Sequence, residues 1–548
     1  MVPVSNRLLI HYLVSALRTL GLRRLVSRVF LWQFVNSYYV QFLSPLILIG
    51  MLSFTLLMPI QAAEMVQSDA QRQFNRLKQH TMLLALAGVN PVFEHNYRRL
   101  LQIEAQGIGS SELSELKTMS AQIDGYWRYI ASSKVCVIKT ISRIEIESDE
   151  GAKDPLATLD ETSLGDDTTA INLPRESQSE CESRVLESAN STQMLSVIEQ
   201  LQLLINLDTS QQWATLTLDE KITPGMDEPL IPEIASRLEL LGYLSQHTTH
   251  TLYSDDLVAA IEAFQWRHGL DPDGVIGRQT LYWLNQSPMM RAKLLAKNTL
   301  RQQIVNLELS GNYLLINIPG FSLQLVEQGH VILNSKVIVG KPSRPTPILD
   351  SLISNVVMNP RWHVPRSIIR RDIVPHILAD AGYLSEREFD MYNSEGKPVV
   401  HSPEEWQRIA ASGFPYRLVQ RPGPKNALGK FKFHFENSYS VYLHGTSEPK
   451  LFNKTNRALS SGCIRVEKVD ELAQWFKTHF VIDKRLWDRL LSNDAQTQWF
   501  ALSNKVPVHL VYFTAWLDEQ GQVQYRNDIY QLEAEFTNSV SADIFFTP

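Results

Sequence analysis

The sequence predicts a multidomain α+β protein, with an all-α scaffold and a small three-helix domain followed by a β-rich domain that carries a helical insertion. Three observations support this class. The chain has 548 residues, which is too long for one hydrophobic core, because single domains rarely exceed about 250 residues. Apolar residues recur at helical spacing in much of the first 309 residues. Short β-branched runs separated by Gly, Pro and Asn follow and predict strands.

The N-terminal segment predicts a membrane span. Residues 1–37 are basic and contain no Asp or Glu, and the run 38–60 is uncharged. A run near the roughly 20 residues that cross a bilayer, preceded by arginines, places residues 1–37 in the cytoplasm and the remainder in the periplasm. The sequence Ile60-Gln-Ala-Ala63 only loosely resembles a cleavage site, and the run is longer than a signal-peptide core. We therefore expect an uncleaved inner-membrane anchor, with a cleaved signal as the alternative.

The segments after this run alternate between helical and disordered composition. Residues 64–140 and 191–231 have helical patterning and predict a scaffold. Residues 141–190 between them are acidic, rich in Ser and Thr and poor in aromatic residues, so we expect a mobile linker or insertion. A helical connection is expected at 289–311.

Residues 232–288 predict three small helices. Gly242 and Gly269 suit the positions just after the first and second helices, and Ser254 is a candidate cap for the second. The runs Leu-Leu-Gly-Tyr-Leu, Ala-Phe-Gln-Trp-Arg-His-Gly-Leu and Asp-Gly-Val-Ile-Gly resemble the three-helix peptidoglycan-binding module. Asp271 and Asp273 lack the other ligand positions of a calcium loop, so we expect a plain turn there.

The β-rich domain is expected at 312–530, with a C-terminal tail at 531–548. A helix is expected at 469–480. The predicted strands cover 313–318, 321–326, 331–339, 355–359, 431–435, 439–443, 509–517 and 523–526.

One insertion, 366–413, interrupts these strands with helix signals. Ser385 with Glu388, and Ser402 with Glu405, both have the spacing of capping boxes. We expect a helical lobe and hypothesise that it is a mobile cap over the cleft. The alternative is an insertion that only packs against the scaffold.

The net charge and the cysteine content limit the partners, metals and cofactors that we expect. A formal charge of −6 offers no basic surface, so we expect no nucleic-acid partner. The three cysteines are too few and too scattered for a zinc site or a disulfide framework, and we expect neither metal nor cofactor. Cys136 and Cys181 are a candidate disulfide in an oxidising compartment, which leaves Cys463 as the free thiol.

The candidate catalytic pair is Cys463 and His444. A free thiol has a pKa near about 8.5, so a catalytic cysteine needs a base or a positive field. His444 follows a predicted strand, while Cys463 lies in a Ser/Gly turn shortly before a predicted helix. No carboxylate follows His444, so the carbonyl of Gly445 is the candidate that orients its ring. The amides of Gly462 and Cys463 are candidate donors to an oxyanion.

Other roles for these residues stay open at this point. Cys463 alone would fit a buried structural cysteine. His363 and His434 are alternative bases, although His434 alternates with Phe433 and Phe435 and is therefore expected to face solvent.

The sequence around His444 and Cys463 resembles the signature of the L,D-transpeptidases. His-Gly-Thr, a spacer, and Ser-Ser-Gly-Cys-Ile-Arg-Val carry the resemblance, and 359–365 and 421–429 resemble flanking segments of the long multidomain branch. The resemblance spans about 312–530 and implies that Cys463 is the nucleophile and His444 its base. Many members have a second His where this chain has Ser461. We expect substrate contacts from Arg465, Gly462, Ser461, Tyr442, Trp362 and Asn426, with a purely structural ion pair as the alternative for Arg465.

The resemblance implies a reaction on peptidoglycan. Cys463 would form a thioester with a tetrapeptide stem and release D-Ala, and an amine of a neighbouring stem would resolve it into a 3-3 cross-link. Acylation of Cys463 by a β-lactam of the carbapenem type is a related expectation. The alternatives are attachment of a protein to the wall and a non-catalytic wall-binding scaffold. Papain-like endopeptidases have Cys before His, the reverse of this chain, and the Gln-Ala-Cys signature of caspases is absent.

Overall fold

The computed structural model describes residues 70–107, 112–132, 191–246, 249–492 and 496–534. The chain divides into two compact units, 1–77 and 78–548, and all elements named below belong to the second. The predicted anchor at 38–60, the acidic segment at 141–190, Cys136 and Cys181 lie outside the described residues. Within the described part, no helix is both long and apolar enough to cross a bilayer.

Long helices form the scaffold. Pro91–Gln106 (α4) begins at Asn90, whose side chain accepts a hydrogen bond from the Val92 amide at 2.8 Å. Its buried Phe93 contacts Tyr126 of Glu112–Ser132 (α5), with ring centroids 6.0 Å apart. Thr192–Ser210 (α8) packs against Pro288–Glu308 (α12), the connection that leads to the sheet. The helical prediction is confirmed for these elements. Residues 211–230, also expected to be helical, form no helix, and Ile222 and Asp227 there make isolated β-bridges to Ile276 and Leu252.

The three-helix domain contains Ile231–Leu240 (α9), Asp255–Arg267 (α10) and Arg278–Leu284 (α11). Gly242 and Gly269 adopt φ of 78° and 64° after α9 and α10, as expected for residues that end helices. Ser254 stands at the N-cap of α10 but makes no side-chain cap bond. Asp273 accepts the Val275 amide at 2.9 Å and thereby closes the predicted turn.

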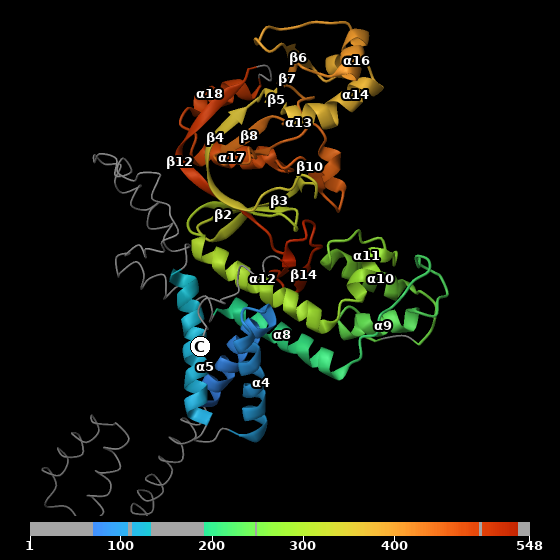
Figure 1. Cartoon of the computed structure of the whole chain (residues 1–548), viewed down its shortest axis with the longest axis vertical. Coiled ribbons are helices and arrows are strands. Elements are labelled where there is room, and N and C mark those ends of the chain that lie inside the picture. Colours follow the sequence, from blue (N-terminus) through green and yellow to red (C-terminus); the bar gives the residue numbers. More distant parts are fainter. Residues whose placement is uncertain (1–69, 108–111, 133–190, 247–248, 493–495, 535–548) are drawn as a thin grey trace, which may run out of the picture. The chain divides into compact units, whose positions relative to one another are not determined.

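A nine-stranded sheet forms the β-rich domain (Figure 1). Its strands follow the order β10-β3-β11-β9-β8-β4-β12-β1-β2. Because β2 also pairs with β3, the sheet closes on itself. A separate hairpin pairs β13 with β14. The strands are Tyr313–Asn317 (β1), Ser322–Glu327 (β2), His330–Gly340 (β3), Leu349–Met358 (β4), Phe431–Phe435 (β8), Leu443–His444 (β9), Ala458–Ser460 (β10), Ile464–Val466 (β11), Gln498–Val511 (β12), Ala515–Leu517 (β13) and Val523–Tyr525 (β14).

Three strand predictions differ clearly from the structure. The strand expected at 355–359 begins six residues earlier, at Leu349 of β4. The strand expected at 439–443 is reduced to β9, because the Asn437 side chain accepts the amides of Tyr439 and Val441, both at 3.1 Å, and holds a turn. The strand expected at 509–517 is divided between β12 and β13. β11 also lies between Cys463 and the following helix, Val469–His479 (α17).

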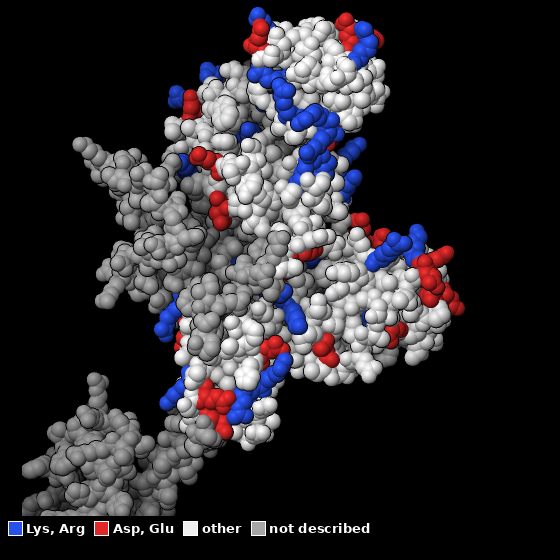
Figure 2. Space-filling model, in the orientation of Figure 1, with Lys and Arg blue, Asp and Glu red and all other residues white. Residues whose placement is uncertain are grey.

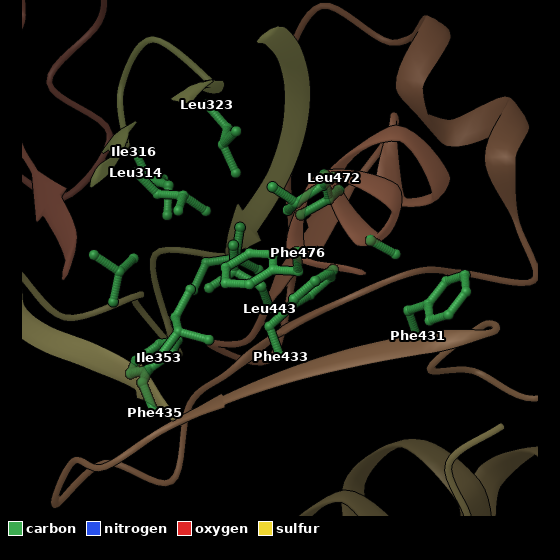
Figure 3. Packing of buried hydrophobic residues seen from close by; sticks show 14 of the residues in the cluster. Leu314, Ile316, Leu323, Ile353, Phe431, Phe433, Phe435, Leu443, Leu472 and Phe476 are labelled. Atoms are coloured by element: carbon green, nitrogen blue, oxygen red, sulfur yellow. The ribbon is translucent and has the colours of Figure 1, made fainter. Parts of the chain in front are cut away.

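The core lies between the sheet and α17 together with Lys484–Leu491 (α18). Phe431, Phe433 and Phe435 alternate along β8 and all point into this core, where Phe433 contacts Phe476 of α17 (Figure 3). Each buried aromatic side chain of this size stabilises the fold by roughly 2–3 kcal/mol. The opposite face of β8, which carries Lys432 and His434, is therefore not part of this core.

The insertion forms a lobe with its own core, which we call the insertion lobe, residues 362–420. The helices expected at 366–413 are present, and the lobe also holds a three-stranded sheet, of which the strand Phe389–Tyr392 inside the insertion was not predicted. Ser402 and Glu405 form the predicted capping box, whereas Ser385 lies inside a helix and donates to the Gly382 carbonyl. The elements are Trp362–His363 (β5), Arg366–Ile368 (α13), the π-helical turn Ile369–Ile373 (η2), Val374–Ala379 (α14), Tyr383–Glu386 (α15), Phe389–Tyr392 (β6), Pro403–Ser412 (α16) and Arg417–Gln420 (β7).

Candidate active site

Three neighbouring strands place the candidate residues on one face of the sheet. In the register of β11, β9 and β8, His444 lies between Arg465 on one side and Lys432 on the other. Side chains alternate along a strand, and Leu443, Ile464 and Phe433 point into the core. The opposite face therefore carries Lys432, Tyr442, His444, Cys463 and Arg465.

The turn that presents Cys463 is held by short hydrogen bonds. The Ser460 hydroxyl donates to the Cys463 carbonyl at 2.6 Å and accepts the Gly462 amide at 3.1 Å. Thr346 donates its hydroxyl to the Gly462 carbonyl at 2.8 Å. Gly462 has φ 116°, which a residue with a side chain rarely adopts. Because its amide is already bonded, Gly462 is not a free oxyanion donor, and the Cys463 amide is the remaining candidate.

The Cys463 thiol is partly exposed, and its Sγ lies 4.0 Å from the Ser440 carbonyl oxygen. Burial raises the pKa of this thiol, and Tyr442, Lys432 and Arg465 only partly oppose that effect. The thiol is therefore protonated at neutral pH and needs a base to react.

His444 is 5% exposed. Burial, followed by the positive charge of Arg465, lowers its pKa to about 3. Its Nδ1 makes no hydrogen bond of normal geometry to another described residue, while the carbonyls of Gly445 and Leu428 act on the ring and partly oppose the lowering. The imidazole is therefore neutral at neutral pH, which is the form able to accept a proton. Orientation of the ring by the Gly445 carbonyl therefore stays a prediction.

The loop that ends at Gly429 supports this arrangement. Asn426 is 1% exposed and donates to the carbonyls of Pro360 at 3.0 Å and Arg421 at 2.7 Å. It also accepts the Leu428 amide at 2.8 Å. A Cβ atom at Gly429 would lie 2.6 Å from the Thr446 nitrogen and 2.9 Å from Gly445. The side chain of Asn426 is thus occupied with the backbone, and it supports the wall beside His444 instead of facing a substrate.

Ser461 connects the nucleophile turn to the insertion lobe through Arg344. The guanidinium donates to the Ser461 hydroxyl at 2.8 Å and pairs with both oxygens of Asp372 in η2, one of them at 2.9 Å. This pairing lowers the pKa of Asp372, so the bridge is charged at neutral pH. The ion pair therefore links the lobe to the residue two positions before Cys463.

The remaining predicted substrate contacts lie around the thiol. The Tyr442 hydroxyl interacts with both the Cys463 thiol and the Trp362 side chain, which brings Trp362 of the lobe to the site. Arg465 pairs with Glu448 at 3.4 Å, a long contact. The choice between a structural ion pair and a substrate contact for Arg465 therefore stays open.

The structure also shows where the two alternative bases, His363 and His434, lie. His363 is exposed in β5. His434 was expected to face solvent, but it is half-buried and its ring lies 5.9 Å from that of Trp499. The structure also adds Lys432, Arg344, Thr346 and Ser460 to the site. The alternation of Phe431, Phe433 and Phe435 marked the face of Lys432 as polar, but only the pairing of β8 with β9 shows that this face carries His444.

Basic side chains are concentrated at the start of the insertion lobe. Figure 2 shows Lys and Arg gathered over the region where Figure 1 labels α13. Exposed Arg366, Arg370 and Arg371 belong to α13 and η2, next to Asp372. This surface favours a ligand that carries negative charge.

Comparison with protein families matches two parts of the chain. Residues 311–487 match the family described as "L,D-transpeptidase catalytic domain", and residues 227–284 match the "Putative peptidoglycan binding domain". The first match ends before β12, although β12 pairs with β4 and β1 inside the same sheet. These matches agree with the fold class, a β-rich domain accompanied by a small helical one.

A curated relative is the "Putative L,D-transpeptidase" of Haemophilus influenzae, 39% identical over 223 residues. The match covers 40% of this chain and 44% of that protein, so the chain spans less than half of its relative. Among solved structures, an L,D-transpeptidase from Stackebrandtia nassauensis shares 13% identity over 55% of this chain and 97% of that one, with a TM-score of 0.20. One from Xylanimonas cellulosilytica shares 15% identity over 54% and 100%, with a TM-score of 0.17.

Proposed function

We propose that this chain, whose residues 311–487 match an L,D-transpeptidase catalytic domain, forms 3-3 cross-links in peptidoglycan through a thioester on Cys463. One observation carries the proposal. His444, kept neutral by burial and by Arg465, shares a sheet face with Cys463, whose thiol burial keeps protonated. A protonated nucleophile beside a neutral base is the arrangement that general-base acyl transfer requires.

In the first half of the reaction, His444 takes the thiol proton as Sγ attacks the carbonyl before the terminal D-Ala of a donor tetrapeptide. The Cys463 amide donates to the oxyanion. The C–N bond then breaks, His444 returns its proton to the departing D-Ala amine, and a thioester remains on Cys463.

In the second half, the side-chain amine of a diamino acid on a neighbouring stem attacks the thioester. His444 accepts a proton from this amine and passes it to the leaving sulfur, which restores the thiol. Water competes with the amine, so the site must exclude it. The insertion lobe, joined to the nucleophile turn through Arg344 and Asp372, is our candidate for that role.

The remaining parts of the chain fit work at the cell wall. The three-helix domain would hold peptidoglycan, and we place the enzyme in the periplasm. The uncharged run at 38–60 would anchor it in the inner membrane. A carbapenem would acylate Cys463 in place of the donor stem.

Muropeptide analysis tests the proposal. The protein is incubated with stems that end in D-Ala, and the products are identified by mass spectrometry. Release of D-Ala together with 3-3 cross-linked stems, both absent with Cys463→Ala, is the expected result. Cross-linking by Cys463→Ala would overturn the proposal. Stems joined to a protein instead of to one another would favour the attachment of proteins to the wall.

A further inference from the structure

Lys432 lies on the active-site face without an acidic partner. It projects from β8 opposite His444 of β9, and its Nζ lies 3.9 Å from the ring centroid of Tyr442. In the described part of the chain, no Asp or Glu pairs with it, whereas Arg465 pairs with Glu448 and Arg344 with Asp372. Lys432 is therefore a cation of this face whose charge no carboxylate offsets.

A half-buried ammonium without a counter-ion is costly, because water is partly removed and nothing of opposite charge replaces it. The Tyr442 ring offsets part of this cost, since a cation over an aromatic face gains about 0.5–2 kcal/mol. Burial lowers the pKa of Lys432, which reflects the remaining cost. An anionic ligand would remove that cost.

Stabilisation of a Cys463 thiolate does not account for this placement. Lys432 acts on the thiol, yet the pKa of Cys463 stays above the ordinary value because burial outweighs Lys432 and Arg465 together. The free enzyme therefore holds a neutral thiol at Cys463. The positive charge of Lys432 faces no anion of the described residues until a ligand binds.

We propose that Lys432 binds the terminal carboxylate of the donor stem and so sets the specificity for a stem that ends in a free carboxylate. This inference rests on the proposed function. That carboxylate belongs to the leaving D-Ala, one residue beyond the carbonyl that Cys463 attacks. Lys432 interacts electrostatically with Cys463 and neighbours His444 in the sheet, so a carboxylate held there places the scissile carbonyl beside the nucleophile.

The arrangement also links ligand binding to the base. Arg465 and Lys432 flank His444 and both oppose its protonation. A carboxylate on Lys432 neutralises one of these two charges at the moment when His444 must take the thiol proton. Binding of the correct donor would therefore ease proton transfer as well as position the bond.

Alkylation of Cys463 by two reagents tests the anion site without any stem peptide. Iodoacetate and iodoacetamide both alkylate sulfur through their CH₂ carbon: the S–C bond forms, the C–I bond breaks, iodide leaves and the thiol proton is released to solvent. They transfer a carboxymethyl and a carbamidomethyl group respectively, so only iodoacetate carries a carboxylate beside the reacting carbon. The rate at Cys463 is followed by mass spectrometry of its peptide. Lys432→Met should lower the ratio of the iodoacetate rate to the iodoacetamide rate about tenfold, the effect of losing one hydrogen bond to a charged group.

Two further variants control this measurement. Lys432→Arg keeps the charge and should retain most of the ratio. Lys336→Met removes a strand lysine that pairs with Glu467 at 3.9 Å in the same sheet, and it should leave the ratio unchanged. A ratio that Lys432→Met does not change overturns the inference. An equal loss of rate with both reagents also does, since Lys432 would then act on the thiol alone.

A second comparison uses donors that end in D-Ala or in D-Ala amide. The unmodified enzyme should prefer the free carboxylate, and Lys432→Met should lose about tenfold of that preference. Failure of the proposed function can be distinguished from failure of the Lys432 inference, because alkylation of Cys463 needs neither a donor nor an acceptor stem. No cross-links together with a ratio that depends on Lys432 would refute transpeptidation and leave an anion site.

Discussion

At the scale of single residues, the site depends on keeping two groups uncharged. Burial raises the pKa of the Cys463 thiol and lowers that of His444 to about 3. Between these values both groups are neutral, so the free enzyme holds no thiolate–imidazolium pair. In the acyl transfer that we propose, the proton would therefore move during the attack, with His444 as the general base.

The pH dependence of alkylation follows from these shifts. The rate of Cys463 with iodoacetamide should rise through the alkaline range with an inflection above the ordinary thiol pKa of about 8.5. The profile should show no plateau below that value, because His444, with a pKa of about 3, is already neutral throughout the range from pH 5 upward. A reactive plateau at pH 5–7, which marks an ion pair, would contradict this description. Mass spectrometry of the Cys463 peptide gives the rate at each pH.

Substitution of the pair should be non-additive. His444→Ala is expected to lower the rate of cross-linking by about 10²–10⁴, the usual contribution of a general base. Cys463→Ala should abolish the thioester, and the double variant should be no worse than Cys463→Ala alone. Circular dichroism establishes that each variant is folded. A folded His444→Ala variant that keeps nearly the full rate of cross-linking would show that His444 is not the base.

At the scale of elements, the insertion lobe and the nucleophile turn meet through one ion pair. Arg344, in the segment between β3 and β4, contacts Asp372 of η2 and Ser461 in the same network. The lobe also reaches the site through Trp362, whose side chain interacts with Tyr442. The insertion lobe is therefore connected to Ser461 through Arg344 and to Tyr442 through Trp362.

Breaking the ion pair should change how the thioester is resolved. Asp372→Asn removes the charge facing Arg344, and we expect the share of hydrolysed stems to rise several-fold while alkylation of Cys463 by iodoacetamide changes less than about twofold. The control is Asp390→Asn, because Asp390 of the lobe pairs with Arg361 and Arg421, the residues that directly flank the lobe, and not with Arg344. Equal partition between hydrolysis and cross-linking in Asp372→Asn and the unmodified enzyme would reject the role of the lobe.

The same bridge has a defined pH range. Arg344 lowers the pKa of Asp372, so the stabilisation is present above the ordinary carboxyl value of about 3.9 and is lost as the pH falls through the lower folded value. Cross-linking assays near neutral pH therefore observe the bridge intact.

Elements with strong local signals were predicted well from sequence. The alternation at 431–435 gave β8 with its bounds unchanged, and Ser402 with Glu405 gave the start of α16. Elements that depend on distant pairing were not predicted. β11 has only three residues and exists because it pairs with β9 and β3, and β6 lies inside the insertion because it pairs with β7.

The site residues show the same difference between local sequence signals and contacts that depend on distant pairing. Cys463 and His444 were predicted from their motif, but the proposal for Lys432 depends on which strand lies next to β8, and no local pattern specifies that. Asn426 was expected to contact substrate because it lies in a matching segment, yet its position saturates its side chain with backbone bonds. Sequence identifies the chemical groups, whereas the fold decides what each one faces.

At the scale of the whole molecule, the three-helix domain contacts the last hairpin of the β-rich domain. Arg526, just after β14, donates to the Arg267 carbonyl at 3.0 Å, at the C-terminal end of α10. Trp283 of α11 donates to Asn527 at 2.9 Å, and Thr455 donates to Asp271. At the centre of this contact, His268 stacks on Tyr525 with ring centroids 5.3 Å apart.

Removing Arg526 should loosen this contact. Arg526→Met leaves the Arg267 carbonyl without its donor and takes a cation from a helix C-terminus, so we expect a loss of about 1–3 kcal/mol in the free energy of unfolding. The loss should appear in calorimetry as earlier melting of the three-helix domain. Arg278→Met, at an exposed position of the same domain, is the control. Unchanged melting of Arg526→Met would show that the contact contributes nothing.

The close approach of Gly429 and Gly445 limits how this enzyme could be altered by laboratory evolution. A methyl group at Gly429 would collide with backbone atoms beside His444, and φ there is +64°. Random libraries should therefore return no functional replacements at Gly429, however many are screened. Exposed positions of the insertion lobe, such as Val400 at 88% exposure, carry no such constraint. Selection for a new acceptor would have to draw its variation from the lobe, while the loop behind the histidine stays unchanged.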